Sequence, residues 1–331
     1  METLILDYIV NNVMNNRKTV GKQISLMNSL FNNAFTLDIT ERDVEERIRT
    51  IKSYQAQLKK LMLLPKIEQR SEIWYATRKE LITASDFAQA IGKGKFASQA
   101  QFYTSKCGYE ESTFDNSIPA LQWGVRYEEV ANLFYQLKMG VQVHEFGLLR
   151  HPIIDFIGAS PDGISKAGIM LEIKCPWKRK CTYTIPEQYY YQIQGQLEVC
   201  DLDECDYLEC FITEFSSYDE MIQDTTCKYK GQIWRTQDSY KYGRINELEH
   251  ACCDTDEVVC YYYGIRDYFL KRVYRDKDFF DSLVPQLREV WDNVTAYRND
   301  EKLYRNSIKK RTVVKKPKFL FRSDGIEEDQ S

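Results

Sequence analysis

Apolar residues recur every three or four positions along two long segments of the chain. The first segment begins at Thr40, which forms a capping-box pattern with Asp43, and it continues to Pro65. The second covers residues 279–294. This spacing places apolar side chains on one side of a helix and polar side chains on the other. We therefore predict two long amphipathic helices, one near each end of the chain.

Between these helices, short apolar runs bounded by turn residues predict strands. The runs cover residues 153–158, 170–174, 207–213, 257–263 and 268–274. The turn residues Pro161-Asp162-Gly163 follow the first run, so we expect the first two runs to form a hairpin with a loose connection. Helical spacing returns at residues 125–134 and 187–197. Strands interleaved with helices predict an α/β fold.

Composition narrows the class of protein. The chain has 331 residues, of which 43% are hydrophobic and 13% aromatic, enough to bury a substantial core in one large domain. A net charge of −4 excludes a globally basic nucleic-acid-binding protein, although a groove can still be locally basic. The ten cysteines include no Cys-x-x-Cys pair, which favours reduced thiols over zinc ligands. With no signal-peptide pattern and no membrane-length apolar stretch, we expect an intracellular protein.

Two carboxylates and a lysine form the clearest chemical motif. Asp162 follows a predicted strand, while Glu172 and Lys174 share one face of the next strand. Both carboxylates and the Ile173 carbonyl are hard oxygen ligands that suit Mg²⁺, or Mn²⁺ in its place. Such a metal activates a water, and Lys174 would orient that water or offset charge at phosphorus. The motif predicts metal-dependent phosphodiester hydrolysis; the alternative is a surface hairpin with an ordinary Glu–Lys pair.

The same motif resembles a known family. Ser160-Pro161-Asp162-Gly163 followed by Leu171–Pro176 is similar to the core of the lambda-exonuclease and YqaJ-type viral recombinases, a branch of the PD-(D/E)XK nucleases. Three further family motifs occur in the family's order, at residues 74–86, 123–128 and 189–194. The resemblance implies a restriction-endonuclease-like core, a mixed central sheet flanked by helices, with an added N-terminal helical segment.

The resemblance also implies roles for residues outside the metal motif. Glu128 would be a further acidic metal ligand, and Gln192 would support the attacking water or the scissile phosphate. Arg78 and Ser85, together with Ser160, would hold the terminal 5′-phosphate of DNA. A helix start beside Ser85 exposes backbone N–H groups that attract an anion. The alternatives are a plain N-cap for Ser85, a solvated Arg78 and a surface Glu128.

We predict three parts along the chain. Residues 1–65 form a helical N-terminal extension, which packs on the nuclease or else mediates oligomerisation or partner contact. Residues 66–300 form the exonuclease domain. Residues 301–331 form a flexible tail, basic and then acidic, that contacts phosphates, directs nuclear import or is simply solvated.

By resemblance, the expected function is that of a Mg²⁺-dependent exodeoxyribonuclease. It would degrade linear double-stranded DNA from 5′ ends and leave 3′ single strands for recombination or for processing of viral or phage DNA. One alternative is a structure-specific endonuclease or an RNA-degrading nuclease with the same site, and another is a non-catalytic DNA-binding scaffold.

The family implies partners and a location as well. Double-stranded DNA ends and a single-strand annealing protein are the expected partners, with no membrane. The oligomeric state stays open between a ring-forming homo-oligomer and a single chain. The expected location is the site of viral or phage DNA replication in the host cell, in the cytoplasm or the nucleus.

Overall fold

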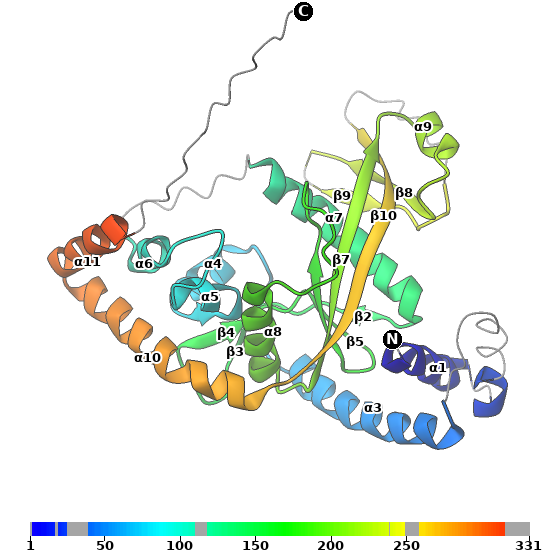
Figure 1. Ribbon diagram of the computed structural model, residues 1–331, viewed down its shortest axis with the longest axis horizontal. Coiled ribbons are helices and arrows are strands. Elements are labelled where there is room, and N and C mark those ends of the chain that lie inside the picture. The colour runs from blue at the N-terminus through cyan, green and yellow to red at the C-terminus, as the bar shows by residue number, and fades with distance from the viewer. Residues whose placement is uncertain are drawn as a thin grey trace, which may run out of the picture.

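A seven-stranded mixed sheet forms the centre of the computed structural model, which describes residues 2–16, 19–24, 39–109, 118–237, 239–248 and 258–314 (Figure 1). β6 and β7 pair in parallel, and the other neighbouring strands pair antiparallel. In order across the sheet, the strands are β2 (Val143–His144), β5 (Gly163–Ser165), β6 (Met170–Lys174), β7 (Glu204–Phe215), β10 (Val259–Tyr274), β8 (Tyr229–Arg235) and β9 (Tyr240–Tyr242).

A smaller sheet of three strands accompanies the central one. β4 (Ile157–Ala159) lies in its middle, parallel to β1 (Ile82–Thr83) and antiparallel to β3 (Leu149–Arg150). All three residues of β4 are buried, and α8 (Glu187–Cys200) packs against this strand. The small sheet therefore brings the segment before Asp162 close to α8.

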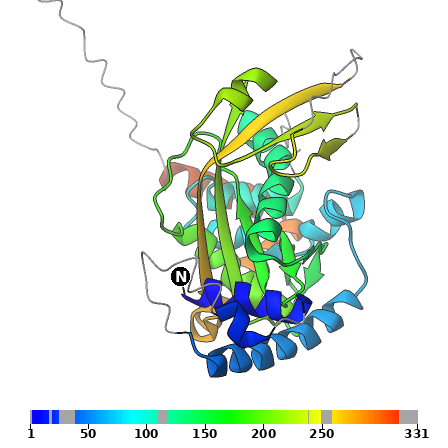
Figure 2. The ribbon, with the colours of Figure 1, turned by 90° about the vertical axis from the view of Figure 1, so that its right-hand side faces the viewer.

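Helices cover both faces of the central sheet. Met170 and Tyr207 pack in a core with α8 and α10 (Lys277–Asn299), whereas Leu171 and Leu208 pack in a second core with α7 (Pro119–Met139). Figure 2 shows α7 along its face of the sheet, with two N-terminal helices at one end. The remaining helices are α1 (Glu2–Asn16), α3 (Glu41–Met62), α4 (Glu72–Lys79), η1 (Ala84–Asp86), α5 (Phe87–Ala90), α6 (Gln99–Cys107), α9 (Tyr218–Gln223) and α11 (Glu301–Val314).

This architecture confirms the predicted α/β class, with a mixed central sheet between helices. Both predicted amphipathic helices form, as α3 and α10, and Thr40 and Asp43 make the capping box at the start of α3. In the described part of the chain, no helix is long and apolar enough to cross a bilayer.

The predicted hairpin was wrong in its first strand. Residues 153–158 do not pair with β6; instead, β4 starts at Ile157 and belongs to the small sheet, and β6 pairs with β5. Pro161 explains the change of sheet, because it lacks an N–H and does not continue a hydrogen-bonded ladder. The last two predicted strands also differ, since they are one strand, β10, with a bulge between Ile265 and Asp267.

The predicted flexible tail is partly helical. α11 covers residues 301–314, and its Tyr304 is fully buried against the rings of Tyr109 and Tyr297. The hydroxyl of Tyr304 also lies 3.0 Å from that of Thr104. These aromatic contacts anchor α11 to the rest of the fold. The basic residues of this segment had led to the prediction of a flexible tail. Residues 315–331, including the acidic end of the predicted tail, lie outside the described residues.

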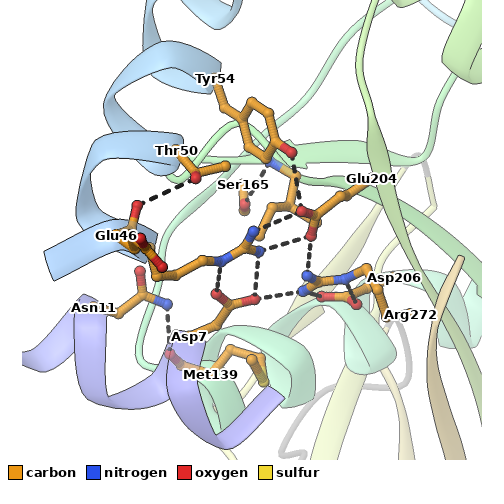
Figure 3. Close-up of polar contacts among 12 residues, drawn as sticks. Asp7, Asn11, Glu46, Thr50, Tyr54, Met139, Ser165, Glu204, Asp206 and Arg272 are labelled. Carbon is orange, nitrogen blue, oxygen red and sulfur yellow. Dashed lines mark hydrogen bonds and ion pairs between the residues drawn. The ribbon is translucent and has the colours of Figure 1, made fainter. Parts of the chain in front are cut away.

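A buried network of charges joins α1 and α3 to the central sheet (Figure 3). Arg47 of α3 donates hydrogen bonds to Asp7 and to Glu204, each at 2.6 Å. Arg272 of β10 binds Asp7 at 2.6 Å and Asp206 at 2.7 Å, and it also pairs with Glu204. None of these five side chains is more than 10% exposed. The N-terminal helices are therefore attached to β7 and β10 by ionic as well as apolar contacts.

Candidate active site

Strand β6 places Glu172 beneath α8. The Glu172 side chain is 0% exposed, and its carboxylate pairs with the ammonium of Lys174. Gln192 donates to Oε1 at 2.7 Å, and Gln196 donates to Oε2 at 2.8 Å. Such burial excludes the alternative of a solvent-facing Glu–Lys pair. It also brings three of the predicted residues, Glu172, Lys174 and Gln192, into direct contact.

Asp162 converges on the same strand from the turn before β5. Its Oδ2 accepts a hydrogen bond from the backbone N–H of Ile173 at 2.6 Å. Burial raises the pKa of Asp162 well above its usual range, and the nearby charges of Glu172 and Glu128 raise it further against the opposing effect of Lys174. The predicted convergence of Asp162 on Glu172 thus occurs, through the backbone of β6.

Lys174 is held as a cation. Burial by itself lowers the pKa of its ammonium, but the carboxylates of Glu172 and Asp162 outweigh that effect and raise the pKa above its usual range. The ammonium also lies 4.8 Å from the centre of the Tyr189 ring. A permanently charged lysine can stabilise negative charge or orient a water, but it is poorly suited to accept a proton.

Glu128 reaches the site from α7 across a cleft of about 340 Å³. Its carboxylate accepts a hydrogen bond from Arg70 at 3.1 Å, and 38% of its side chain is exposed. Burial raises the pKa of Glu128, while Arg70 and Lys174 oppose the rise. The charged residues that line the cleft are five acids and two bases: Glu68, Glu128, Glu129, Glu145, Asp162, Lys66 and Arg70.

The donors at this cleft fit a divalent cation in their chemistry. Asp162, Glu128 and Ile173 line one cleft, so two carboxylates and a backbone segment offer hard oxygen atoms to the same space. The acidic lining also carries an excess of negative charge, which a cation would relieve. Among the described residues, no group of three His, Cys, Asp or Glu side chains already has metal-binding geometry. The metal and its ligand set stay a prediction.

A second cluster contains the residues predicted to hold a phosphate. Arg78 donates to the hydroxyl of Ser85 at 3.2 Å, and its guanidinium lies 4.6 Å from the centre of the Trp74 ring. The Trp74 indole in turn donates to the hydroxyl of Ser160 at 3.0 Å. Thr83, not Ser85, caps the short helix η1, so the alternative of a plain N-cap does not hold for Ser85. Arg78, Ser85 and Ser160 therefore lie in one connected cluster.

Lys106 supports this cluster through its contacts with Arg78 and Asp86, and no sequence pattern predicted this role. Its buried ammonium donates to the backbone carbonyl of Arg78 at 2.7 Å and to Asp86 at 2.9 Å. Burial raises the pKa of Asp86, but Lys106 and Arg78 more than offset this and bring it to about 2. No local pattern marks Lys106, because it lies on α6, twenty residues along the chain from Asp86.

Gln196 is another residue at the site, and the sequence motifs gave it no role. Its amide donates to Glu172 and, at 3.4 Å, to the carbonyl of Ser160, which links β6 to the segment before Asp162. The i,i+4 spacing of Gln192 and Gln196 was a usable signal. Gln194 instead faces away from the site and donates to the carbonyl of Tyr274 at 3.0 Å.

Comparison with known proteins gives one family match and one curated relative. Residues 73–203 match the model of the YqaJ-like viral recombinase domain. Over 297 residues, the chain is 26% identical to an uncharacterized protein of Acanthamoeba polyphaga mimivirus, with 71% of this chain and 54% of that protein covered. The chain thus spans about half the length of the curated relative it matches.

Solved structures are similar to parts of the chain, among them two of an alkaline exonuclease and one of a phage-related exonuclease. An alkaline exonuclease from Laribacter hongkongensis is 22% identical with a TM-score of 0.47, and its complex with dAMP is 23% identical with a TM-score of 0.46. Both comparisons cover 72% of this chain and 100% of the other. A phage-related exonuclease from Haemophilus somnus is 15% identical with a TM-score of 0.38, covering 70% of this chain and 96% of the other.

Proposed function

From the match of residues 73–203 to the YqaJ-like viral recombinase domain, we propose that the protein is a Mg²⁺-dependent exodeoxyribonuclease. It degrades linear double-stranded DNA from 5′ ends and leaves 3′ single strands for recombination or viral DNA processing. The match agrees with the resemblance inferred from the motifs. One observation carries the proposal: Asp162, Glu172 and Lys174 meet at β6, beside an acidic cleft.

The side chains at and beside the cleft would have different roles in hydrolysis. Asp162, Glu172, Glu128 and the Ile173 carbonyl would hold Mg²⁺, which supplies Lewis-acid activation of a water and of the phosphate when bound. Lys174 keeps its positive charge and offsets the negative charge that develops at phosphorus. Glu172 fixes the position of the Lys174 ammonium.

The amides of α8 make that position rigid. Gln192 and Gln196 each donate to one oxygen of Glu172, so the carboxylate that holds Lys174 is itself oriented from two sides. A buried polar group with its hydrogen bonds made loses little energy to reorganisation during reaction. We assign Gln192 to this support of the reacting groups.

Arg78, Ser85 and Ser160 would bind the 5′-phosphate of the DNA end. The guanidinium and two hydroxyls supply donors, and Lys106, which is paired with Asp86, holds the backbone carbonyl of Arg78 in position. A single-strand annealing protein is the partner that this role implies. The place of action would be where viral or phage DNA is replicated.

The deciding experiment is Mg²⁺-dependent digestion of a linear duplex with different labels at its 5′ and 3′ ends. A closed circular duplex and single-stranded RNA are treated in parallel, and the Lys174→Ala variant is the control. Early release of the 5′ label with intact circles and RNA supports the proposal. Cut circles or degraded RNA would replace it with the endonuclease or ribonuclease alternative. If Lys174→Ala makes no difference to cleavage, the site assignment fails.

Arg78→Ala is expected to slow digestion of 5′-phosphorylated ends by about tenfold to a hundredfold, the value of one charge-assisted hydrogen bond. Ends carrying a 5′-hydroxyl should change little, because they lack the anion that Arg78 binds. Initial rates on the two kinds of end give the comparison, and Lys79→Ala on the same helix controls for loss of one exposed charge. Equal losses on both ends would rule out phosphate recognition by Arg78.

A further inference from the structure

Arg70 is a cation at the acidic cleft that neither the motifs nor the family match accounts for. The match begins at residue 73, so Arg70 lies in the segment just before it. Its guanidinium lies 3.1 Å from Glu128, and it lines the same cleft as Asp162 and Ile173. Arg70 therefore contacts one expected metal ligand and shares a cleft with another.

The backbone of Arg70 adopts an unusual conformation. Its φ of +66° lies in the left-handed region, which favours glycine and is costly for a side chain such as arginine. Residues held in such a conformation persist where the surrounding structure fixes them, and they are frequent at functional sites. The left-handed backbone of Arg70 therefore points to a functional role for the Arg70 side chain.

Several contacts fix the segment that carries Arg70. The backbone N–H of Leu148 donates to the carbonyl of Ile67 at 3.0 Å. A side chain at Gly147 would place its Cβ 1.7 Å from that carbonyl oxygen, so only glycine allows this close approach. Gln69 donates to the carbonyl of Pro161 at 3.3 Å, directly before Asp162. The position of Arg70 is therefore tied to the turn that carries Asp162.

The guanidinium is also available to a ligand in the cleft. Among the described residues, Glu128 is the ionic partner of Arg70, and 48% of the arginine side chain is exposed. A guanidinium presents five N–H donors in a planar fork that matches the oxygens of a phosphate. One contact with Glu128 leaves further N–H donors of this half-exposed guanidinium, which lines the cleft, available to a ligand.

We propose that Arg70 exchanges partners during the reaction of this nuclease. Without metal, Arg70 neutralises Glu128. When a divalent cation takes Glu128, the guanidinium binds a phosphate oxygen of the DNA strand in the cleft. The inference rests on the proposed function, and it deepens that function by naming a phosphate ligand outside the family domain.

Partner exchange predicts that removing the Arg70 side chain changes the affinities for metal and for DNA in opposite directions. Arg70 competes with the metal for Glu128, so its removal strengthens metal binding. Arg70 also binds DNA, so its removal weakens DNA binding. A residue that only supports the fold would weaken both, because a distorted cleft binds neither ligand well.

Arg70→Gly tests the exchange, since glycine keeps the left-handed backbone while removing the charge. Calorimetry with Mn²⁺ alone measures the metal affinity, and fluorescence anisotropy of a 5′-phosphorylated duplex in Ca²⁺ measures DNA binding. We expect Arg70→Gly to bind Mn²⁺ about threefold more tightly and the duplex about tenfold more weakly, near 1.4 kcal/mol. Arg70→Lys, which keeps the charge and loses the fork, should lie between parent and glycine variant.

Lys52→Ala, at an exposed position of α3 outside the residues that line the cleft, controls for the loss of one positive charge and should match the parent. The exchange is overturned if Arg70→Gly lowers the affinity for both Mn²⁺ and DNA, or if it changes neither affinity. The proposed function still stands in these cases, provided that the parent protein cleaves DNA. A parent protein that cleaves no DNA overturns the proposed function and the exchange with it.

Discussion

Lys174→Ala should lower the rate of DNA hydrolysis by about a hundredfold to a thousandfold, the usual loss for removing one fixed charge that stabilises a transition state. The ammonium of Lys174 is held by the buried carboxylate of Glu172, so it is already in place before substrate arrives. Because its pKa is raised, the charge is present throughout the neutral range. DNA binding should be largely retained, since the cleft and the phosphate cluster remain. Single-turnover cleavage and anisotropy measure the two quantities separately.

Two companion variants make this result specific. Asp162→Asn should lower the rate of hydrolysis to a similar degree, because an amide keeps the shape of the side chain but is a poorer metal ligand. Lys166→Ala changes an exposed lysine of the same β5–β6 hairpin, away from the cleft, and should retain full activity. Full activity of Lys174→Ala or of Asp162→Asn would exclude the catalytic assignment, and a loss in Lys166→Ala would indicate general damage to the hairpin.

Arg272→Ala should lower the free energy of unfolding by about 3–5 kcal/mol, which is typical when one partner of a buried ion pair is removed. Arg272 binds Asp7, Glu204 and Asp206 together (Figure 3). Its loss leaves Asp7 and Glu204 with Arg47, and it leaves Asp206 with the hydroxyl of Tyr135 but with no arginine in the network. The penalty arises from uncompensated charge in a region poor in water. Urea unfolding followed by circular dichroism measures the change.

A matched control is Arg244→Ala, which removes an arginine from an exposed pair with Glu247. Exposed pairs contribute about 0–1 kcal/mol, so this variant should be close to the parent. If Arg272→Ala loses no more stability than Arg244→Ala, the network does not hold α1 and α3 on the sheet. A large loss would show that the buried network stabilises the fold.

Local patterns were sufficient for much of the fold. The capping box at Thr40 and the apolar spacing after it predicted α3, because helix starts and amphipathic faces depend on residues only a few positions apart. The pairing of strands was harder to predict from the sequence. β6 was predicted with the wrong partner, since the choice between β4 and β5 depends on where Pro161 moves the chain in space.

The sequence by itself determined the chemical groups of the site. Asp162, Glu172 and Lys174 are recognisable because two carboxylates and a lysine at this spacing form a local motif that is typical of metal-dependent phosphodiester hydrolysis. Tertiary structure decided the surroundings of these groups. Arg70, Lys106 and Gln196 come from separate elements and carry no local signal of their roles, apart from the helical spacing of Gln196.

The physical reason is the range of each interaction. Helix caps, alternating strand faces and turn residues act over a few positions, so the chain displays them directly. The balance of charge at the cleft, and the burial that raises the pKa of Asp162, arise from residues far apart in sequence. Only the folded chain brings those residues within a few ångströms, where burial and charge act on the same groups.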